Sequence, residues 1–248
     1  MSGPIARSLG GSGLVLSNAW SIFNNQAAMA NVEHLNIGAS ATRIYNIEQL
    51  NEMTMGFSLP VKNAGTLGIS YSGQGIAGLY QQNEIGLAMA RSFGANFSMG
   101  IAFQVLNISI PEYGNKWLLK PELGIILKPE ENLSLAVHIS NPFGAFISES
   151  ANERAPTQVR IGAGYSTGEA VKLLAEVSAA SNQKTRLHAG LLYTLNEKVQ
   201  LSTGFSTRDL SSSFGAHFTF KKVSVNLAFS YHQRLGSTPE LGMAYAAD

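Results

Sequence analysis

The chain has 248 residues, of which 17 are Lys or Arg and 16 are Asp or Glu, and its net charge is +1. Charged residues make up 13% of the chain, half of the ~25% that is usual in a soluble globular domain, while 25 residues are Gly. This composition excludes a disordered chain and a basic nucleic-acid-binding protein, and the absence of Cys excludes disulfides, thiolate metal sites and Cys nucleophiles.

The first 34 residues are mostly uncharged and rich in Gly, Ser and Asn. The uncharged run from residue 8 to residue 32 is too polar for the centre of a bilayer, so we predict no membrane-spanning helix there. Residues 1–5 lack the charged region and the apolar core of a secretory signal. We therefore expect a chain without a signal peptide.

From residue 35 onward, apolar residues alternate with small or polar ones in fourteen segments that are separated by Gly, Asn, Pro and Ser. A repeat of two residues is typical of a β-strand, because successive side chains of a strand point to opposite faces. One face of these segments comprises 56 residues without a single charge, and Met53, Met55 and Phe57 are an example. The other face carries charged residues, four of the five His, and many Gly, Ser and Thr.

The composition of the two faces indicates which of them meets lipid or solvent. In a soluble sandwich or barrel the apolar face would turn inward, and the outer surface would be poor in charge and prone to edge pairing. In a transmembrane barrel the apolar face meets lipid and small polar side chains fill the lumen, which accounts for both the low charge and the many glycines. We therefore predict an all-β protein, an antiparallel up-and-down barrel of about fourteen strands in the outer membrane.

The connections between the segments support this interpretation. Every odd-numbered connection is expected to be longer than the even-numbered ones beside it, and residues 140–157 form the longest. Outer-membrane barrels have short periplasmic turns and longer loops outside. An even number of strands then places both ends of the barrel sequence on the short-turn side.

Residues 1–34 are expected to lie inside the barrel. A barrel of this size has a lumen that wall side chains alone do not fill, so we predict a plug at residues 1–34 and a barrel at residues 35–248; a periplasmic extension is the alternative. The polar residues of the inward face are predicted to form a network of ion pairs that holds the barrel and the plug together. This lumen network comprises Glu52, Glu84, Lys120, Glu122, Arg160, Lys172, Glu176, Arg186, His188, His217 and Glu240.

A motif in the N-terminal segment resembles one in a known family. Phe23, Asn24, Asn25, Gln26 and Ala27 follow a Gly-rich stretch and precede the first predicted strand. This order resembles the amino-terminal hatch of the FadL-like outer-membrane proteins, and more narrowly that of their PorV/PorQ branch, although Gln26 stands where Pro is common. The resemblance implies one of two functions. FadL-type members pass hydrophobic molecules through the hatch and out through a gap at the third strand, whereas PorV-like members capture exported proteins at the type IX secretion translocon.

Four glycines lie in and after the third predicted strand, at Gly68, Gly73, Gly75 and Gly78. Missing side chains would permit a bend or a gap in the wall, so these residues are a candidate lateral opening. An ordinary Gly-rich loop is the alternative.

No set of residues has the spacing of a catalytic or metal site. Only two Asp are present, no Ser and His spacing singles out a triad, and no two His lie within five residues of each other. We therefore expect no enzyme activity, no catalytic residue, no metal and no cofactor. The sequence predicts an outer-membrane barrel, monomeric within a larger complex, that acts in protein secretion or surface assembly with a secretion translocon or exported proteins as partners. The alternative is a transporter of hydrophobic small molecules.

Overall fold

The computed structural model describes residues 3–76, 78–112, 114–148, 153–207 and 210–247. Its N-terminal part holds three short helices, namely α1 (Pro4–Ser8), α2 (Ser21–Asn24) and the 3-10 helix η1 (Gln26–Asn31). None of the helices in these residues combines the length and the hydropathy of a membrane-spanning helix.

Nearly all of the remaining chain is strand. The strands are β1 (Asn36–Arg43), β2 (Asn51–Val61), β3 (Gly65–Ile76), β4 (Tyr80–Phe93), β5 (Phe97–Ile110), β6 (Gly114–Glu130), β7 (Leu133–Ser140), β8 (Phe146–Ser148), β9 (Glu153–Arg154), β10 (Gln158–Thr167), β11 (Val171–Ala180), β12 (Gln183–Asn196), β13 (Val199–Ser206), β14 (Ser211–Phe220), β15 (Val223–His232) and β16 (Gly236–Ala246). A single 3-10 turn, η2 (Ile44–Asn46), follows β1.

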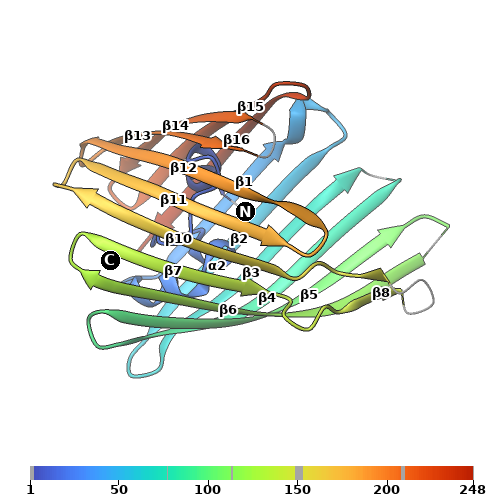
Figure 1. The fold of residues 1–248 in the computed structure, drawn as a ribbon, viewed down its shortest axis with the longest axis horizontal. Coiled ribbons are helices and arrows are strands. Elements are labelled where there is room, and N and C mark those ends of the chain that lie inside the picture. The colour runs from blue at the N-terminus through green and yellow to red at the C-terminus, as the bar shows by residue number, and fades with distance from the viewer. Residues whose placement is uncertain (1–2, 77, 113, 149–152, 208–209, 248) are drawn as a thin grey trace.

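Fourteen of these strands close into one antiparallel barrel in which consecutive strands are neighbours (Figure 1). β1 pairs with β16 from Asn36↔Ala246 to Thr42↔Glu240, and this pair closes the barrel. β7 pairs directly with β10, because β8 and β9 form a separate two-stranded hairpin within the connection between them. The predicted antiparallel barrel of fourteen strands is confirmed.

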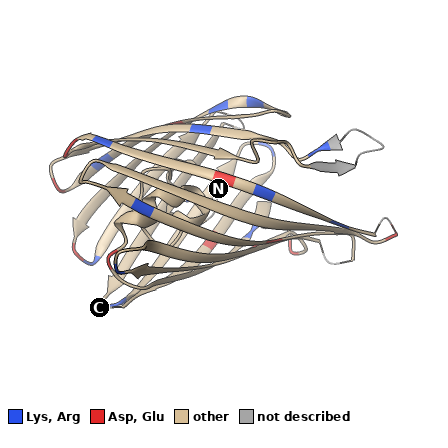
Figure 2. Ribbon diagram, turned by 90° about the horizontal axis from the view of Figure 1, so that it is seen from below, with Lys and Arg blue, Asp and Glu red and all other residues tan. Residues whose placement is uncertain are grey.

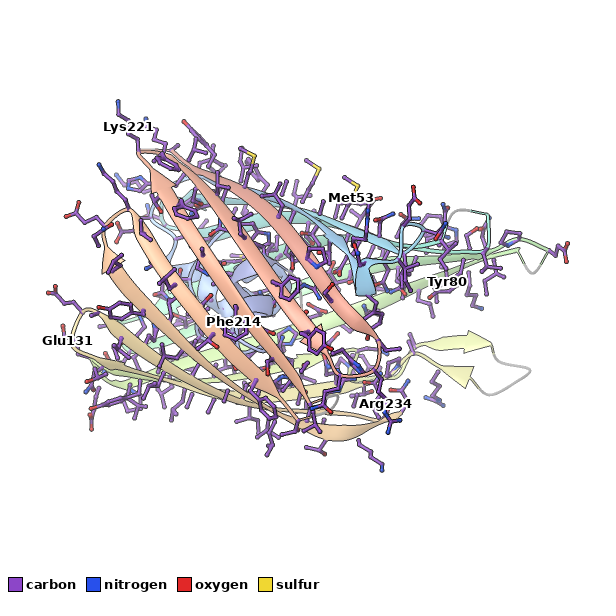
Figure 3. All side chains as sticks on the ribbon, turned by 90° about the horizontal axis from the view of Figure 1, so that it is seen from above. Met53, Tyr80, Glu131, Phe214, Lys221 and Arg234 are labelled. Carbon is purple, nitrogen blue, oxygen red and sulfur yellow. The ribbon has the colours of Figure 1, made fainter. Side chains whose placement is uncertain are left out.

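The two faces of the strands are oriented as predicted. On β2 the side chains of Met53 and Met55 are 57% and 54% exposed, whereas Thr54 between them is buried. Figure 3 shows Met53 and Phe214 on the outside of the barrel, and Figure 2 shows that charged residues are sparse along the wall. The outside of the barrel therefore suits the hydrocarbon core of a bilayer, and the polar side chains line the lumen.

The two ends of the barrel differ. The short-turn end carries the connections at residues 62–64, 94–96, 131–132, 168–170, 197–198 and 221–222, together with the start of β1 and the end of β16. The opposite end, called the long-loop end, carries the longest connection, which was expected at residues 140–157 and lies at residues 141–157. In Figure 3, Glu131 and Lys221 mark the short-turn end, and Tyr80 and Arg234 mark the long-loop end.

The predicted alternation of long and short connections is wrong at three places. Only residues 77–79, 111–113 and 181–182 separate the strands there. The reason is that the strands continue as paired hairpins instead of ending in loops. β5 and β6, for example, pair without interruption from Phe97↔Leu127 to Ile110↔Gly114, and Figure 1 shows β4, β5 and β6 extending beyond most of the barrel.

The hydrophobic core lies inside the barrel, between its wall and the N-terminal segment, defined here as residues 3–34. Leu9, Trp20 and Met29 of this segment are at most 1% exposed. Met29 belongs to a cluster with Ala88 and Ala102 of the inner wall. The wall contributes small residues such as Ala88 and Ala102 together with Ile126 and Leu174, and the N-terminal segment contributes most of the large ones.

Candidate functional site in the barrel lumen

Inward-facing glycines allow the N-terminal segment to lie directly against the wall. A Cβ atom added at Gly204 of β13 would lie 2.0 Å from the carbonyl carbon of Leu9, and one added at Gly38 of β1 would lie 2.8 Å from the Cβ atom of Ala19. One added at Gly100 of β5 would lie 2.5 Å from a backbone nitrogen of η1. Because these strands lie on different sides of the barrel, the segment contacts the wall around the lumen, and Figure 1 shows α2 within the ring of strands.

Arg7 of α1 joins the N-terminal segment to two strands near the closure of the barrel. Its guanidinium lies 2.9 Å from the carboxylate of Glu52 on β2 and donates a second hydrogen bond to Glu240 on β16, whose side chain is 1% exposed. Ser40 of β1 donates to the other oxygen of Glu240 at 2.8 Å. Burial alone would lower the pKa of Arg7, but the attraction of Glu240 and Glu52 outweighs it and raises this pKa, so the side chain stays cationic. The sequence identified both carboxylates but not Arg7, which stands in a Gly-rich stretch without a charged neighbour.

Arg160 of β10 and Glu176 of β11 form a second anchor, with Arg160 Nε 2.6 Å from Glu176 Oε1. Arg160 also donates to the backbone carbonyls of Asn24 at 3.2 Å and Gly11 at 3.4 Å. Glu176 accepts a hydrogen bond of 3.2 Å from the backbone N–H of Gly13. Each member of this buried ion pair therefore bonds both to its partner on the wall and to the backbone of the N-terminal segment.

Gln26, the residue at the Pro position of the resembled motif, is held between two wall residues. Its amide nitrogen donates to Glu122 Oε2 of β6 at 2.6 Å, and its amide oxygen lies 3.1 Å from His138 Nε2 of β7. The amide oxygen only accepts, so His138 Nε2 is the donor. Ser140 donates to the other oxygen of Glu122 at 2.8 Å. A proline at position 26 would remove both side-chain contacts.

The other residues of the motif shape the backbone of the segment. Asn25 accepts from the backbone N–H of Ala27 at 3.1 Å and donates to the carbonyl of Leu14 at 3.1 Å, so it joins two parts of the segment. Asn24 donates to a backbone carbonyl of the same segment at 3.1 Å. Phe23 faces a cavity of the lumen. The motif therefore packs within the lumen.

Two predicted histidines contact α1 and the residues after it. His188 Nδ1 lies 2.7 Å from the carbonyl oxygen of Gly10 and therefore donates to it, so its Nε2 accepts from Ser178 at 2.9 Å. His217 lies 3.1 Å from Asn226 Oδ1 and within hydrogen-bond distance of two serines, one on the wall and one in α1. Both imidazole rings therefore connect the wall and the N-terminal segment through hydrogen bonds.

The remaining predicted charges belong to the wall, and Glu84 and Lys120 line the same cavity as Glu122 and Arg160. Lys120 Nζ is 2.5 Å from Glu84 Oε2, a pair between two strands of the wall. Lys172 lies near the short-turn end, and Glu176 of the same strand pairs with Arg160 instead. Arg186 donates to Gln183, three residues away on its own strand. The predicted network is therefore several separate groups.

Over residues 65–76, the part of the candidate lateral opening that lies in β3 shows no gap in the wall. Residues 66–75 pair with both β2 and β4 without a register shift, so hydrogen bonds close the wall on both sides. Gly68 lies against side chains of α2 and η1, which a Cβ atom would approach to 2.6 Å or less. Gly73 lies within the ladder, while Gly75 and Gly78 have φ angles of +141° and +77°, which favour glycine.

Two cavities lie on opposite sides of the N-terminal segment. The chamber, toward the long-loop end, has a volume of about 170 Å³ and polar walls that include Glu84, Gln104, Lys120, Glu122 and Arg160, with Phe23 as its aromatic residue. The vestibule, at the short-turn end, has a volume of about 450 Å³, and its lining includes Ile5, Val15, Leu16, Val171, Lys172 and Leu192. The segment thus separates a polar space from one that is partly apolar.

No described protein family and no curated protein sequence matches this chain. Its fold is nevertheless similar to those of solved outer-membrane transporters. A Pseudomonas aeruginosa FadL homologue matches with a TM-score of 0.75 and 11% identity, over 98% of each chain. The toluene transporter TbuX of Ralstonia pickettii matches with a TM-score of 0.71 and 10% identity, over 99% of this chain and 97% of that one. The toluene transporter TodX of Pseudomonas putida matches with a TM-score of 0.72 and 9% identity, over 97% and 96%.

These likenesses define the class of protein to which the fold corresponds. It is the fold of a closed fourteen-strand barrel, shared at 9–11% identity with a FadL homologue and two toluene transporters, and the neighbours named are transporters rather than enzymes. None of them is a PorV or PorQ protein, so the narrower resemblance stays a prediction. Association with a translocon or with exported proteins also stays a prediction of the sequence.

Proposed function

We propose that this chain conducts small hydrophobic molecules across the outer membrane and that its N-terminal segment is the hatch that gates the lumen. One observation carries the proposal. The segment lies across the lumen, yet within the described residues it contributes no strand to the barrel ladder. It can therefore move while every strand of the wall keeps its hydrogen bonds.

The route that we propose joins the two cavities. A solute that enters at the long-loop end reaches the chamber, and a displacement of the hatch would connect the chamber with the vestibule. Ile5, Val15 and Leu16 of the hatch and Val171 and Leu192 of the wall supply apolar surface in the vestibule. A hydrophobic solute would bind to this apolar lining of the vestibule, because the contact removes apolar surface of both the solute and the protein from water.

The fold neighbours support a hydrophobic solute. TbuX and TodX are described as toluene transporters, and their barrels match this chain over nearly its whole length. Toluene is therefore a suitable first probe. Protein secretion is not proposed, because the neighbours named are transporters.

A reversible lock of the hatch tests the proposal. The chain contains no Cys, so the double variant Ala19→Cys/Gly38→Cys introduces the only possible disulfide, between the hatch and β1. The Cβ atom of Ala19 would lie 2.8 Å from a Cβ at position 38, and a shift of about 1 Å gives the Cβ separation of a disulfide. Uptake of radiolabelled toluene is measured in Gram-negative cells that express each variant.

We expect the wild type to raise toluene uptake several-fold, the oxidised double variant to abolish this increase, and a reductant to restore it. The two single Cys variants are the controls and should conduct in both conditions. Wild-type cells that take up toluene no faster than cells without the protein would contradict transport. Equal uptake by the oxidised and reduced double variant would contradict the gating role of the hatch.

A further inference from the structure

Among the described residues, the outer wall of the barrel has two marked hollows. The one with the more apolar lining spans β6, β7, β10, β11 and β12 and has a volume of about 690 Å³. The outward side chains of Ala163 and Ala175 form part of its lining, and large apolar side chains such as Leu135, Ile161 and Leu187 surround them. These three are between 39% and 56% exposed.

The strand register explains why the wall is hollow here. Ala163 of β10 pairs with Ala175 of β11, which pairs with Ala189 of β12, so three small outward residues form a row across neighbouring strands. The next outward row toward the long-loop end consists of Ile161, Val177 and Leu187, which also pair in register. Large side chains beside a row of methyl groups produce a groove that runs across the strands.

We propose that this groove is a specific binding site for the acyl chain of a membrane lipid. The groove is continuous with the apolar band that faces hydrocarbon, and its outward side chains are all apolar. Water has no hydrogen-bond partner on such a surface, and an empty groove would forfeit the contacts of every side chain that lines it. A flexible hydrocarbon chain fills the space and keeps these contacts, so the lipid in this groove is held more tightly than the lipid around the rest of the barrel.

The experiment fills the groove from the protein side. The double variant Ala163→Leu/Ala175→Leu places two larger apolar side chains in the hollow, and Ala39→Leu on β1 is the matched control. Ala39 is an outward alanine as well, and it pairs with Met55 and Met243 away from the groove. Because Leu suits a lipid-facing position, all three proteins should fold, which a heat-dependent shift in gel mobility checks. Each is reconstituted in phosphatidylethanolamine vesicles and extracted in mild detergent, and retained lipid is counted by native mass spectrometry.

We expect the wild type and the Ala39→Leu variant to retain a phosphatidylethanolamine molecule. The fraction of protein with retained lipid should be at least ten-fold lower in the double variant. Equal retention by the double variant, or no retention by the wild type, would overturn the proposal. A wild-type dimer that dissociates in the double variant would also overturn it, because the occupant would then be a second copy of the chain. The readout does not involve transport, so its outcome is independent of the proposed channel function.

Discussion

The residues that hold the hatch divide their roles between charge and backbone. The wall supplies the buried carboxylates Glu176 and Glu240 and the half-buried Glu52, whereas the hatch supplies Arg7 and several backbone N–H and C=O groups. The hydrogen bonds between charged wall side chains and backbone groups of the hatch contribute about 1.5–3 kcal/mol each. Loss of Arg7 leaves the buried Glu240 and the half-buried Glu52 without their cation.

Arg7→Ala should therefore loosen the hatch without breaking the barrel. Glu240 and Glu52 flank Thr42 of β1 in register, so removing Arg7 leaves two carboxylates on either side of one strand. We expect a cost of about 2–3 kcal/mol, at or below the lower end of the range for a broken buried pair, because Arg7 is 21% exposed. Single-channel recordings in planar bilayers should show at least ten-fold more frequent openings than in the wild type.

Arg43→Ala, which removes an exposed guanidinium from the end of β1, is the control for this measurement and should leave the recordings unchanged. If the Arg7→Ala channel stays as closed as the wild type, Arg7 does not hold the hatch.

The pair of Arg160 and Glu176 provides a second test at this scale. Both side chains are at most 3% exposed, so Arg160→Met leaves an unpaired buried carboxylate and should cost about 3–5 kcal/mol. The double variant Arg160→Met/Glu176→Leu removes both charges and should recover at least half of this loss. Urea unfolding in detergent micelles, followed by tryptophan fluorescence, measures the difference. A double variant that is less stable than Arg160→Met would show that the unpaired charge of Glu176 is not the main cause of the loss of stability in Arg160→Met.

Sequence patterns located the inward charges but did not predict most of their partners. Lys172 and Glu176 share one face of β11, but four residues along a strand span about 13 Å, which no direct ion pair bridges. Glu176 instead meets Arg160 of the neighbouring strand, and that partner depends on a register that no single strand reveals. Arg7 was missed for a related reason, since its partners lie 45 and 233 residues away in the sequence.

At the scale of the element, the strands were predictable because a repeat of two residues is a local signal. Their lengths were less so. β5 continues to residue 110 and β6 begins at residue 114, although polar and apolar residues alternate less regularly in these parts of the strands, because each strand supplies the backbone partner of the other. The closed wall at β3 has the same origin, since ladders on both sides hold the glycines that made this strand a candidate opening.

Gly204→Ala tests whether the fit between β13 and α1 depends on the missing side chain. Gly204 lacks the positive φ angle that would strain an alanine, so the barrel itself tolerates the change. The added Cβ would lie 2.0 Å from the backbone of Leu9, and the hatch has to move away. Hydrogen exchange measured by mass spectrometry should become at least ten-fold faster in residues 5–16.

Gly162→Ala is the matched control, since its nearest contact would be 3.3 Å and a shift of a few tenths of an ångström relieves it. Exchange in the hatch should stay within two-fold of the wild type in this variant. Equal protection of the hatch amides from hydrogen exchange in both variants would mean that the hatch does not pack against Gly204.

The whole molecule combines a lipid-facing exterior with an interior held by ion pairs and hydrogen bonds. A closed barrel satisfies the backbone groups of its strands within the wall, so its outward side chains are free to be uniformly apolar. The same closure places the charges of the inward face in a confined lumen, where they need partners. This explains why the chain has so little charge and why much of the charge that its strands carry contacts either the hatch or a neighbouring strand.

Lysine substitutions at two depths in the bilayer test directly whether the apolar band faces lipid. Leu87 is 61% exposed in the middle part of β4, whereas Leu195 is 56% exposed beside the turn at residues 197–198. Lysine costs about 2–4 kcal/mol on the lipid face near the middle of a bilayer and about 0–1 kcal/mol near its surface. Leu87→Lys should therefore lower the stability of the barrel in phosphatidylcholine vesicles by about that larger amount, and Leu195→Lys should leave it nearly unchanged, as measured by urea titration of the gel-mobility shift. Equal effects at both positions would contradict a bilayer that surrounds the barrel at the level of Leu87.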